Sequence, residues 1–516
     1  MTLDLSRMPV LVACGQFTEH DRSGRGMVPP QLIAQACQIA GQDSESTDLL
    51  SAVGHVAVAG LTIDADVVNI PISRGYKNLP KSVANLLDIT PKRFTYVAPG
   101  GNTPQYLVNH FAEQIALGHE ETVLITGGES LATMLARFDR WYKWLMPKSE
   151  WRDDPGGIPE SLGDTRPGCT PHEAKHGLEL PANVYPLFEN ALQHKYQRSQ
   201  SDHLAAVGAL FARFTKVAAA NPYAWFQTER SAEDLITHTS QNRMVAFPYT
   251  KQMNSMIGVN QAAAVIMTSL EKARSLGIAV AKMVFLHGCA DANDHWNLLE
   301  RVNFHSSPAM HRCAQEALKM AGKSINDIAH FDLYSCFPSA VQVACDEFGL
   351  SHDDSRGLTL TGGLPYFGGP GNNYSLHGIA ELMQRLRANP GDFGLLNANG
   401  WYLTKHALGV YSTQPLESAW ERADKTVYQA ELLAQPATNF TESPAGKATI
   451  ETFTVVHDRS GKPKQGIIIG RQEDGLRFVA NTPKDRGMMH SLCVGNAIGR
   501  VGEVASRSGK NTFRLV

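Results

Sequence analysis

Short β-rich runs alternate with stretches of helical periodicity along most of the chain. Residues 102–117 carry apolar side chains at the spacing of one helix face, at Leu107, Val108, Phe111 and Ile115. The β-branched run at 122–125 follows this helix and leads into a pair of glycines. Strands and helices that alternate in this way predict parallel strands joined by crossover helices, which is the α/β class.

The same alternation occupies two halves of the chain and suggests an internal duplication. In the first half it predicts strands and helices at 9–13, 30–40, 53–58, 102–117, 122–125, 262–268 and 271–276. In the second half it predicts them at 308–321, 331–334, 339–348, 375–388 and 393–396. We therefore expect one half over residues 1–275 and another over residues 276–435.

Two segments depart from this pattern. Residues 131–247 are irregular and rich in Trp, Arg, Lys, Pro and Gly, with helices expected at 182–197 and 201–220. A segment of this length is not a bare loop in a compact protein, so it predicts an inserted lid or subdomain. Over residues 436–516, short runs alternate apolar with polar positions between glycine-containing turns, which predicts a small all-β barrel.

Composition narrows the class of protein. The chain has 516 residues, 43% hydrophobic and 19% charged, with a net charge of -3, which argues against a nucleic acid as the main partner. No apolar stretch reaches the ~20 residues that span a bilayer, and the first residues lack a signal-peptide pattern. The eight cysteines form no C-x-x-C pair, so we expect reduced thiols, no disulfide framework, no metal site and a cytoplasmic location.

The glycine-rich run TGGLPYFGGPGNNYSLHGIAEL at 361–382 precedes a predicted helix. Glycine accepts positive φ angles and lets a ligand approach the backbone, and a helix N-terminus favours an anionic or carbonyl oxygen. Gly362, Gly363, Gly368 and Gly369 fit such a pocket. The alternative is a tight strand-to-helix turn without a ligand.

Several motifs in this order resemble the thiolase superfamily. The glycine run is similar to the signature GGxxxxGHPxG, and residues 332–337, DLYSCF, stand where that family has NEAF or HDCF. Further likeness lies at 118–130, at 260–264 and at 397–400, so the resemblance covers about residues 9–410. It implies a duplicated αβαβα five-layer fold. The C-terminal segment resembles the added OB-like domain of the type 1 thiolase-like proteins, which are usually labelled acetyl-CoA acetyltransferases.

The positions that the family uses for catalysis differ in this chain. The nucleophilic cysteine falls on Gly101, the GHP histidine on Gly369 and the C-x-G cysteine on Ala398. Tyr334 stands where the family has the Asn or His that helps to hold the thioester oxygen. Loss of a nucleophile and its base costs many orders of magnitude in rate. We therefore predict that condensation or thiolysis through an acyl-cysteine is absent.

Three side chains are the predicted catalytic candidates. Tyr334 can donate a hydrogen bond or, at a lowered pKa, accept a proton. Cys336 is a second candidate, and the alternative interpretation is an inert buried thiol. His377 is the third candidate, and the alternative interpretation is a structural role. The predicted substrate-binding residues are Gly101, Gly368, Gly369, Ala398 and Asn399.

The resemblance implies coenzyme A or acyl-CoA as a substrate and no permanently bound cofactor. Arg137, Arg140 and Lys143 stand among aromatic residues of the inserted segment and can pair with phosphates; the alternative is a solvated amphipathic helix. The first hypothesis is an acyl-CoA-processing, acyltransferase-like enzyme of lipid metabolism that lacks the cysteine. The alternatives are a 3-hydroxyacyl-CoA retro-aldolase and a non-catalytic acyl-CoA-binding scaffold, as a homodimer or a monomer.

Overall fold

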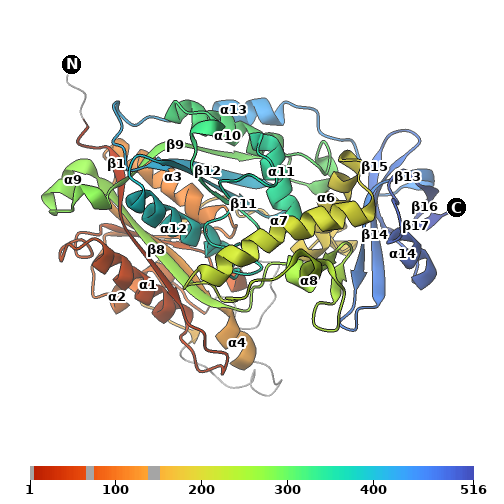
Figure 1. Cartoon of the computed structure of the whole chain (residues 1–516), viewed down its shortest axis with the longest axis horizontal. Helices are drawn as coiled ribbons and strands as arrows, with labels where there is room; N and C mark the ends of the chain where they lie inside the picture. The colour runs from red at the N-terminus through yellow and green to blue at the C-terminus, as the bar shows by residue number, and fades with distance from the viewer. Residues whose placement is uncertain (1–4, 65–74, 138–150) are drawn as a thin grey trace.

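Ten strands form one mixed sheet in the computed structural model, which describes residues 5–64, 75–137 and 151–516 (Figure 1). Their order is β10 (His330–Leu333), β11 (Phe393–Gly400), β12 (Lys405–Ser412), β9 (Val284–Asn293), β1 (Pro9–Thr18), β8 (Asn260–Ser269), β4 (Thr122–Ser130), β2 (His55–Ala59), β3 (Arg93–Val97) and β5 (Glu160–Leu162). Only two residue pairs join β9 to β1, so the sheet consists of two half-sheets that meet at this point.

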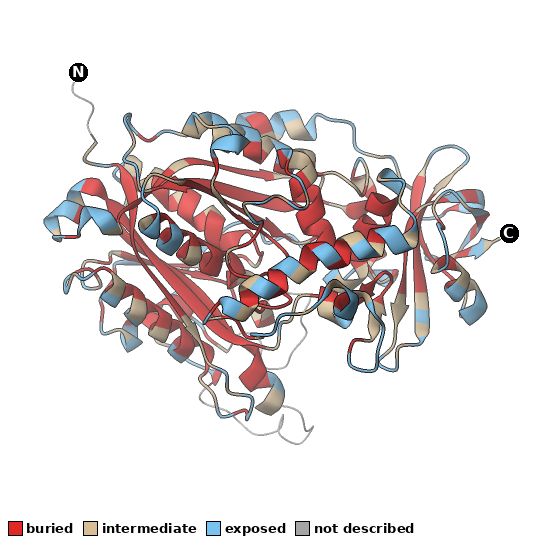
Figure 2. Cartoon of the chain, viewed as in Figure 1, coloured by how far each residue is buried: buried red, intermediate tan, exposed pale blue. Residues whose placement is uncertain are grey.

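Helices and half-sheets alternate in five layers. The middle layer is α3 (Thr103–Ala116) and α12 (Tyr374–Ala388), which contact strands of both half-sheets. The outer helices are α1 (Pro29–Asp43), α2 (Leu79–Leu86) and α9 (Leu270–Ser275) on one side, and α10 (Pro308–Ala321) and α11 (Pro338–Phe348) on the other. Figure 2 shows α3 and α12 buried over most of their surface, as their place between two sheets requires. The predicted α/β five-layer fold is confirmed.

Four strands of the ten-stranded sheet were missing from the sequence prediction: β3, β5, β9 and β12. Almost all residues of β9 and every residue of β12 are buried, so neither strand shows the apolar-polar alternation of a half-exposed strand. The expected parallel pairing holds between β2, β3 and β4 and between β10 and β11. The strands β1, β8, β9 and β12 pair antiparallel, so the sheet is mixed.

Most regular elements described in the inserted segment are helices, and its last strand, β6 (Met244–Ala246), pairs with the C-terminal strand β13 (Ala445–His457). Its elements are α4 (Leu131–Arg137), β5, α5 (Pro171–Lys175), α6 (Pro181–Lys195), α7 (Gln200–Ala220), α8 (Ala232–Ile236) and β6 (Met244–Ala246), with β7 (Tyr249–Thr250) directly after it. The helices α6 and α7 pack against α11 of the core. Figure 2 shows one face of α7 exposed and the other buried, which is the pattern of a helix that lies on a surface.

The C-terminal strands close a five-stranded barrel. After α13 (Lys425–Leu433) they are β13 (Ala445–His457), β14 (Pro463–Gln472), β15 (Arg477–Asn481), β16 (Val501–Arg507) and β17 (Lys510–Leu515), with α14 (Arg486–Leu492) between β15 and β16. The pairing runs β13-β14-β15-β17-β16 and returns to β13, which is the closed arrangement of an OB-like barrel. Phe453, Ile468, Phe478 and Phe513 fill its interior. No helix within the described ranges is long and apolar enough to cross a bilayer.

Candidate functional site

Gly101 lies directly before α3, and the phenol of Tyr334 occupies the space beside it. A Cβ atom built on Gly101 would overlap the Tyr334 Oη and would lie 2.5 Å from Cζ and 2.6 Å from the Asn399 carbonyl oxygen. Tyr334 follows the end of β10, and its backbone N–H donates to the Asn397 Oδ1 at 2.8 Å. The tyrosine therefore fills the position where the resemblance expects a nucleophilic side chain.

Tyr334 is buried among other aromatic and hydroxyl groups. The residue is 6% exposed, and its ring meets the Tyr374 ring edge-on, with centroids 5.5 Å apart. Burial raises the pKa of Tyr334 well above its ordinary value, and it raises the pKa of Tyr374 in the same way. The Tyr374 hydroxyl pairs with the Thr361 Oγ1 at 2.5 Å. Both phenols therefore stay protonated at neutral pH, which suits hydrogen-bond donors and does not suit a general base.

Cys336 lies two residues beyond Tyr334 at the start of the loop into α11. Burial raises the pKa of its thiol to about 12, so the thiolate that would act as a nucleophile is scarce at neutral pH. Its backbone oxygen accepts a hydrogen bond from the Ser255 N–H at 3.1 Å. This geometry favours the inert-thiol alternative for the side chain.

Ala398 and Asn399 lie on β11 beside Gly101. Ala398 is fully buried and is paired with Ala407 of β12. The Asn399 Oδ1 accepts a hydrogen bond from the Tyr185 hydroxyl at 3.0 Å, whereas its Nδ2 is buried without a partner among the described atoms. Asn399 thus keeps one unused buried donor on the strand whose backbone lies beside Gly101.

The two glycine pairs have different neighbours. Gly362, at φ +108°, lies against the backbone of Ala218 in α7, so its lack of a side chain serves the packing of the inserted segment. Gly368, at φ +118°, lies against the Gln261 Oε1, and the Gly369 N–H donates to the Met256 oxygen at 2.9 Å. Gly362 therefore fits the interpretation of a tight turn that binds no ligand. Gly368 and Gly369 remain candidates for a pocket wall.

His377 lies on the other side of α12, toward β1. Its Nδ1 is 2.8 Å from the Gln16 Oε1, and the Gln16 Nε2 donates to Glu381 at 2.9 Å, so the imidazole donates through Nδ1. Burial lowers the pKa of His377 to about 3, and its Nε2 is buried without a partner among the described atoms. Its ring neighbour is Phe367 at 5.0 Å. The structure thus brings Tyr334 and Cys336 together, while the contacts of His377 lie elsewhere.

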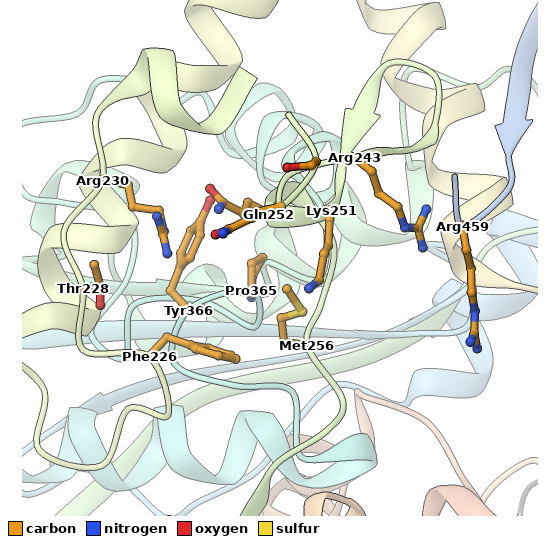
Figure 3. A pocket seen from close by; sticks show the side chains of 12 residues that line it. Phe226, Thr228, Arg230, Arg243, Lys251, Gln252, Met256, Pro365, Tyr366 and Arg459 are labelled. Atoms are coloured by element: carbon orange, nitrogen blue, oxygen red, sulfur yellow. The ribbon is translucent and has the colours of Figure 1, made fainter. Parts of the chain in front are cut away.

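A cavity of about 670 Å³ opens between the inserted segment, the glycine run and the barrel (Figure 3). Its apolar wall contains Phe226, Met256, Pro365 and Tyr366, and its polar wall contains Arg230, Arg243, Lys251 and Arg459. Among the described residues, no carboxylate lies within ion-pair distance of these four cations. We call this cavity the basic pocket. An anionic ligand with an apolar part matches these walls.

Backbone hydrogen bonds join the basic pocket to the buried cluster around Tyr334. Met256, in the pocket wall, accepts from the Gly369 N–H, and the preceding Ser255 donates to the Cys336 oxygen. The Tyr366 hydroxyl in the same wall is buried without a described partner. The pocket therefore adjoins the glycine run through Pro365 and Tyr366, whereas none of the predicted catalytic or substrate-binding residues is among its described lining residues.

Of the predicted phosphate-binding residues only Arg137 is described, and it is not among the described lining residues of this pocket. Arg137 ends α4, whereas Arg140 and Lys143 lie outside the described residues. The four pocket cations were missed because they are spread over more than two hundred residues, unlike the cluster of cations and aromatic residues at 137–148. Three of them lie at the end of the inserted segment or just beyond it, where a search for isolated arginines and lysines beside Phe or Tyr would have found them.

Lys405 is a second residue that the sequence analysis did not select. It begins β12 and is 5% exposed, and its Nζ donates to the Pro99 oxygen at 2.9 Å. Burial lowers the pKa of Lys405 to about 8. It lines another cavity, of about 540 Å³, together with Asn102, Tyr106 and Lys425, and the described lining residues of the two cavities do not overlap. No group of acidic, histidine or cysteine side chains in the described ranges is arranged to hold a metal ion.

Solved structures place this architecture among the thiolases. The human mitochondrial 3-ketoacyl-CoA thiolase aligns with 80% of this chain and 100% of its own, at 14% identity and a TM-score of 0.57. The structure of an Ltp2-ChsH2(DUF35) aldolase aligns with 79% of this chain and 98% of its own, at 19% identity and a TM-score of 0.55. At these identities the likeness shows the fold alone, which is the thiolase fold.

A much closer relative defines the family. The crystal structure of a monomeric SCP2-thiolase-like protein type 1 from Mycobacterium smegmatis is 38% identical, covers 99% of both chains and gives a TM-score of 0.84. The model of the additional C-terminal domain of thiolase-like protein type 1 matches residues 428–508. Among curated proteins none matches the chain. The chain belongs to the SCP2-thiolase-like type 1 proteins.

Proposed function

We propose that this protein binds coenzyme A thioesters in the basic pocket and does not form an acyl-enzyme. The observation that carries the proposal is that one pocket combines four cations without described carboxylate partners and an apolar wall that includes Met256, whose backbone oxygen accepts from the Gly369 N–H. A coenzyme A thioester combines phosphates with a long neutral arm and an acyl group, so it matches both walls. Membership of a family related to thiolases supports this ligand class.

The buried cluster favours binding over acyl transfer. Tyr334 fills the nucleophile position, Cys336 is held as a thiol, and Gly369 and Ala398 have no side chain that could move a proton. A retro-aldol reaction needs a base on the β-hydroxyl group, and burial keeps Tyr334 and Tyr374 protonated. Of the three functions expected from the sequence, the geometry therefore supports the non-catalytic acyl-CoA-binding protein best.

Removal of two pocket cations is expected to weaken ligand binding strongly. The double variant Arg243→Ala and Lys251→Ala should raise the Kd of acetyl-CoA by about 25-fold, because each solvent-exposed charge pair contributes about 1 kcal/mol. Isothermal titration calorimetry at low ionic strength measures this change. Lys484→Ala, an exposed lysine of the barrel outside the pocket, is the control and should bind as the wild type does.

The same proteins test the absence of catalysis. Wild-type protein incubated with 3-ketoacyl-CoA or 3-hydroxyacyl-CoA, with and without free coenzyme A, should yield no product by mass spectrometry. A product that requires free coenzyme A would establish acyl transfer instead, and a carbonyl compound with a shortened thioester would establish a lyase. If the wild-type protein does not bind acetyl-CoA, the proposed function is wrong.

We further propose that the protein acts as a monomer. The strand β5 of the inserted segment pairs with the edge strand β3 through Thr95, Tyr96 and Val97, so this edge of the sheet is already occupied. The Mycobacterium smegmatis relative is described as monomeric. Sedimentation velocity should show one species near 56.3 kDa, and a species of twice this mass at micromolar concentration would contradict the proposal.

A further inference from the structure

The C-terminal barrel and one wall of the basic pocket belong to the same sheet. Arg243 directly precedes β6, and β6 pairs with the barrel strand β13. The Phe247 N–H extends this pairing by donating to the Val455 oxygen at 2.9 Å. The strand β7 returns along β6, and the Lys251 N–H donates to the Arg243 oxygen at 2.8 Å. The barrel therefore holds in place the segment that carries two of the pocket cations.

The turn between β13 and β14 reaches the pocket itself. The Asp458 Oδ1 accepts hydrogen bonds from the backbone N–H groups of Ser460 and Lys462, at 2.8 and 3.1 Å, so its carboxylate is engaged within the turn. This network leaves Arg459 exposed at the tip of the turn, where it lines the basic pocket. In Figure 3 Arg459 lies beyond Arg243, at the far side of the pocket from Tyr366.

Positive charge gathers at this far side. Arg243 and Arg459 stand there, Lys251 lies in the middle of the pocket beside Pro365 and Met256, and Arg230 stands beside Tyr366 (Figure 3). Burial lowers the pKa of His457 at the end of β13, and the positive charge of Arg243 acts in the same direction. The barrel end of the pocket is thus the more positive end, and the Tyr366 end is the one that adjoins the glycine run.

We infer that the C-terminal barrel is part of the ligand site, with Arg459 binding the phosphate-bearing end of the coenzyme A group. This inference rests on the function proposed above. Coenzyme A carries all its negative charge on its nucleotide, whereas its pantetheine arm is neutral. The charge distribution therefore places the nucleotide at the barrel and directs the thioester toward Gly369. The additional domain acts as a phosphate-recognition element of the pocket.

Three ligands and three full-length variants test this role. The ligands are coenzyme A, its 3′-dephospho form and pantetheine, and the variants are Arg459→Ala, Arg243→Ala and Arg486→Ala, titrated by calorimetry at low ionic strength. Arg486 is the matched control, because it is an exposed arginine of the same barrel at the start of α14, outside the pocket. Thermal unfolding of each variant shows whether the fold is kept, and a change at the exposed Arg459 should leave the midpoint unchanged.

The expected result is specific to the phosphates. Arg459→Ala should raise the Kd of coenzyme A about fivefold, in line with an exposed charge pair, and should leave pantetheine binding unchanged. Arg486→Ala should match the wild type with every ligand. If Arg459→Ala binds coenzyme A as tightly as the wild type while Arg243→Ala binds it more weakly, this inference is overturned and the proposed function is not. The same holds if Arg459→Ala weakens pantetheine binding as much as coenzyme A binding. Unchanged binding by both pocket variants would overturn the proposed function as well.

Discussion

Gly101→Cys is expected to destabilise the protein by about 3 kcal/mol and to leave it without thiolase activity. The new Cβ would overlap the Tyr334 hydroxyl and crowd the Asn399 carbonyl, and neither the buried ring nor the β11 backbone can move aside freely. Activity stays absent because Gly369 and Ala398 supply no acid or base. Urea denaturation measures the free energy of unfolding, and a thiolysis assay measures the activity.

A double-mutant cycle isolates the clash. Tyr334→Ala alone should cost about 3 kcal/mol, because it leaves a cavity in the middle of the molecule. The double variant Gly101→Cys and Tyr334→Ala should be clearly more stable than the sum of the two losses, since the cysteine then has room. Gly54→Cys is the control, because a Cβ there has a single neighbour, the Thr122 oxygen at 3.8 Å. Additive losses, or a stable Gly101→Cys protein, would show that Tyr334 does not occupy this space.

Glu189→Gln is expected to cost about 3 kcal/mol or more at neutral pH. The carboxylate is fully buried between α6, α7 and α11, where it contacts His203 and accepts hydrogen bonds from Tyr249 and Gln342. The amide cannot replace the charge, and it turns an acceptor into a donor that faces other donors. Since Tyr249 belongs to β7, beside Lys251, weaker acetyl-CoA binding should accompany the loss of stability.

The loss caused by Glu189→Gln should depend on pH in a defined direction. Burial raises the pKa of Glu189, but the hydrogen bond and charge of His203 and the hydrogen bonds of Tyr249 and Gln342 together outweigh it, so the folded-state pKa lies below the ordinary 4.5. The carboxylate therefore stabilises the fold fully above about pH 4.5 and loses this effect as the pH falls through the lower, folded-state value. Chemical denaturation at pH 7 and near pH 4 should show a smaller difference at the lower pH. The exposed Glu421→Gln is the control, and an equal difference at both values would contradict the assignment.

Local patterns determined the class of fold and much of its layout. The 3.6-residue spacing of Leu107, Val108, Phe111 and Ile115 predicts the buried helix α3, and all four side chains are buried. The alternation after residue 436 predicts the barrel, and the order of the glycine motifs predicts the thiolase fold. The sequence analysis did not predict strands β9 and β12, because a strand that is buried on both faces lacks the alternation of apolar and polar residues.

The missing cysteine at Gly101 could be recognised from the motif spacing, but the residue that replaces it in space could not. Tyr334 is separated from Gly101 by more than two hundred residues, and its phenol arrives there because β10 pairs with β11, which contacts α3. His377 lies in the expected helix, yet its orientation toward Gln16 depends on how α12 sits between two sheets.

By itself, then, the sequence determined the elements, their order and the absence of the usual nucleophile, because these depend on neighbouring residues and motif spacing. Tertiary structure alone decided which side chains share a pocket. Arg230 and Lys251 come from the middle of the chain and Arg459 from the barrel, and they meet only because β6 joins the barrel sheet. Contacts between such distant positions arise from the packing of whole elements, which no local periodicity encodes.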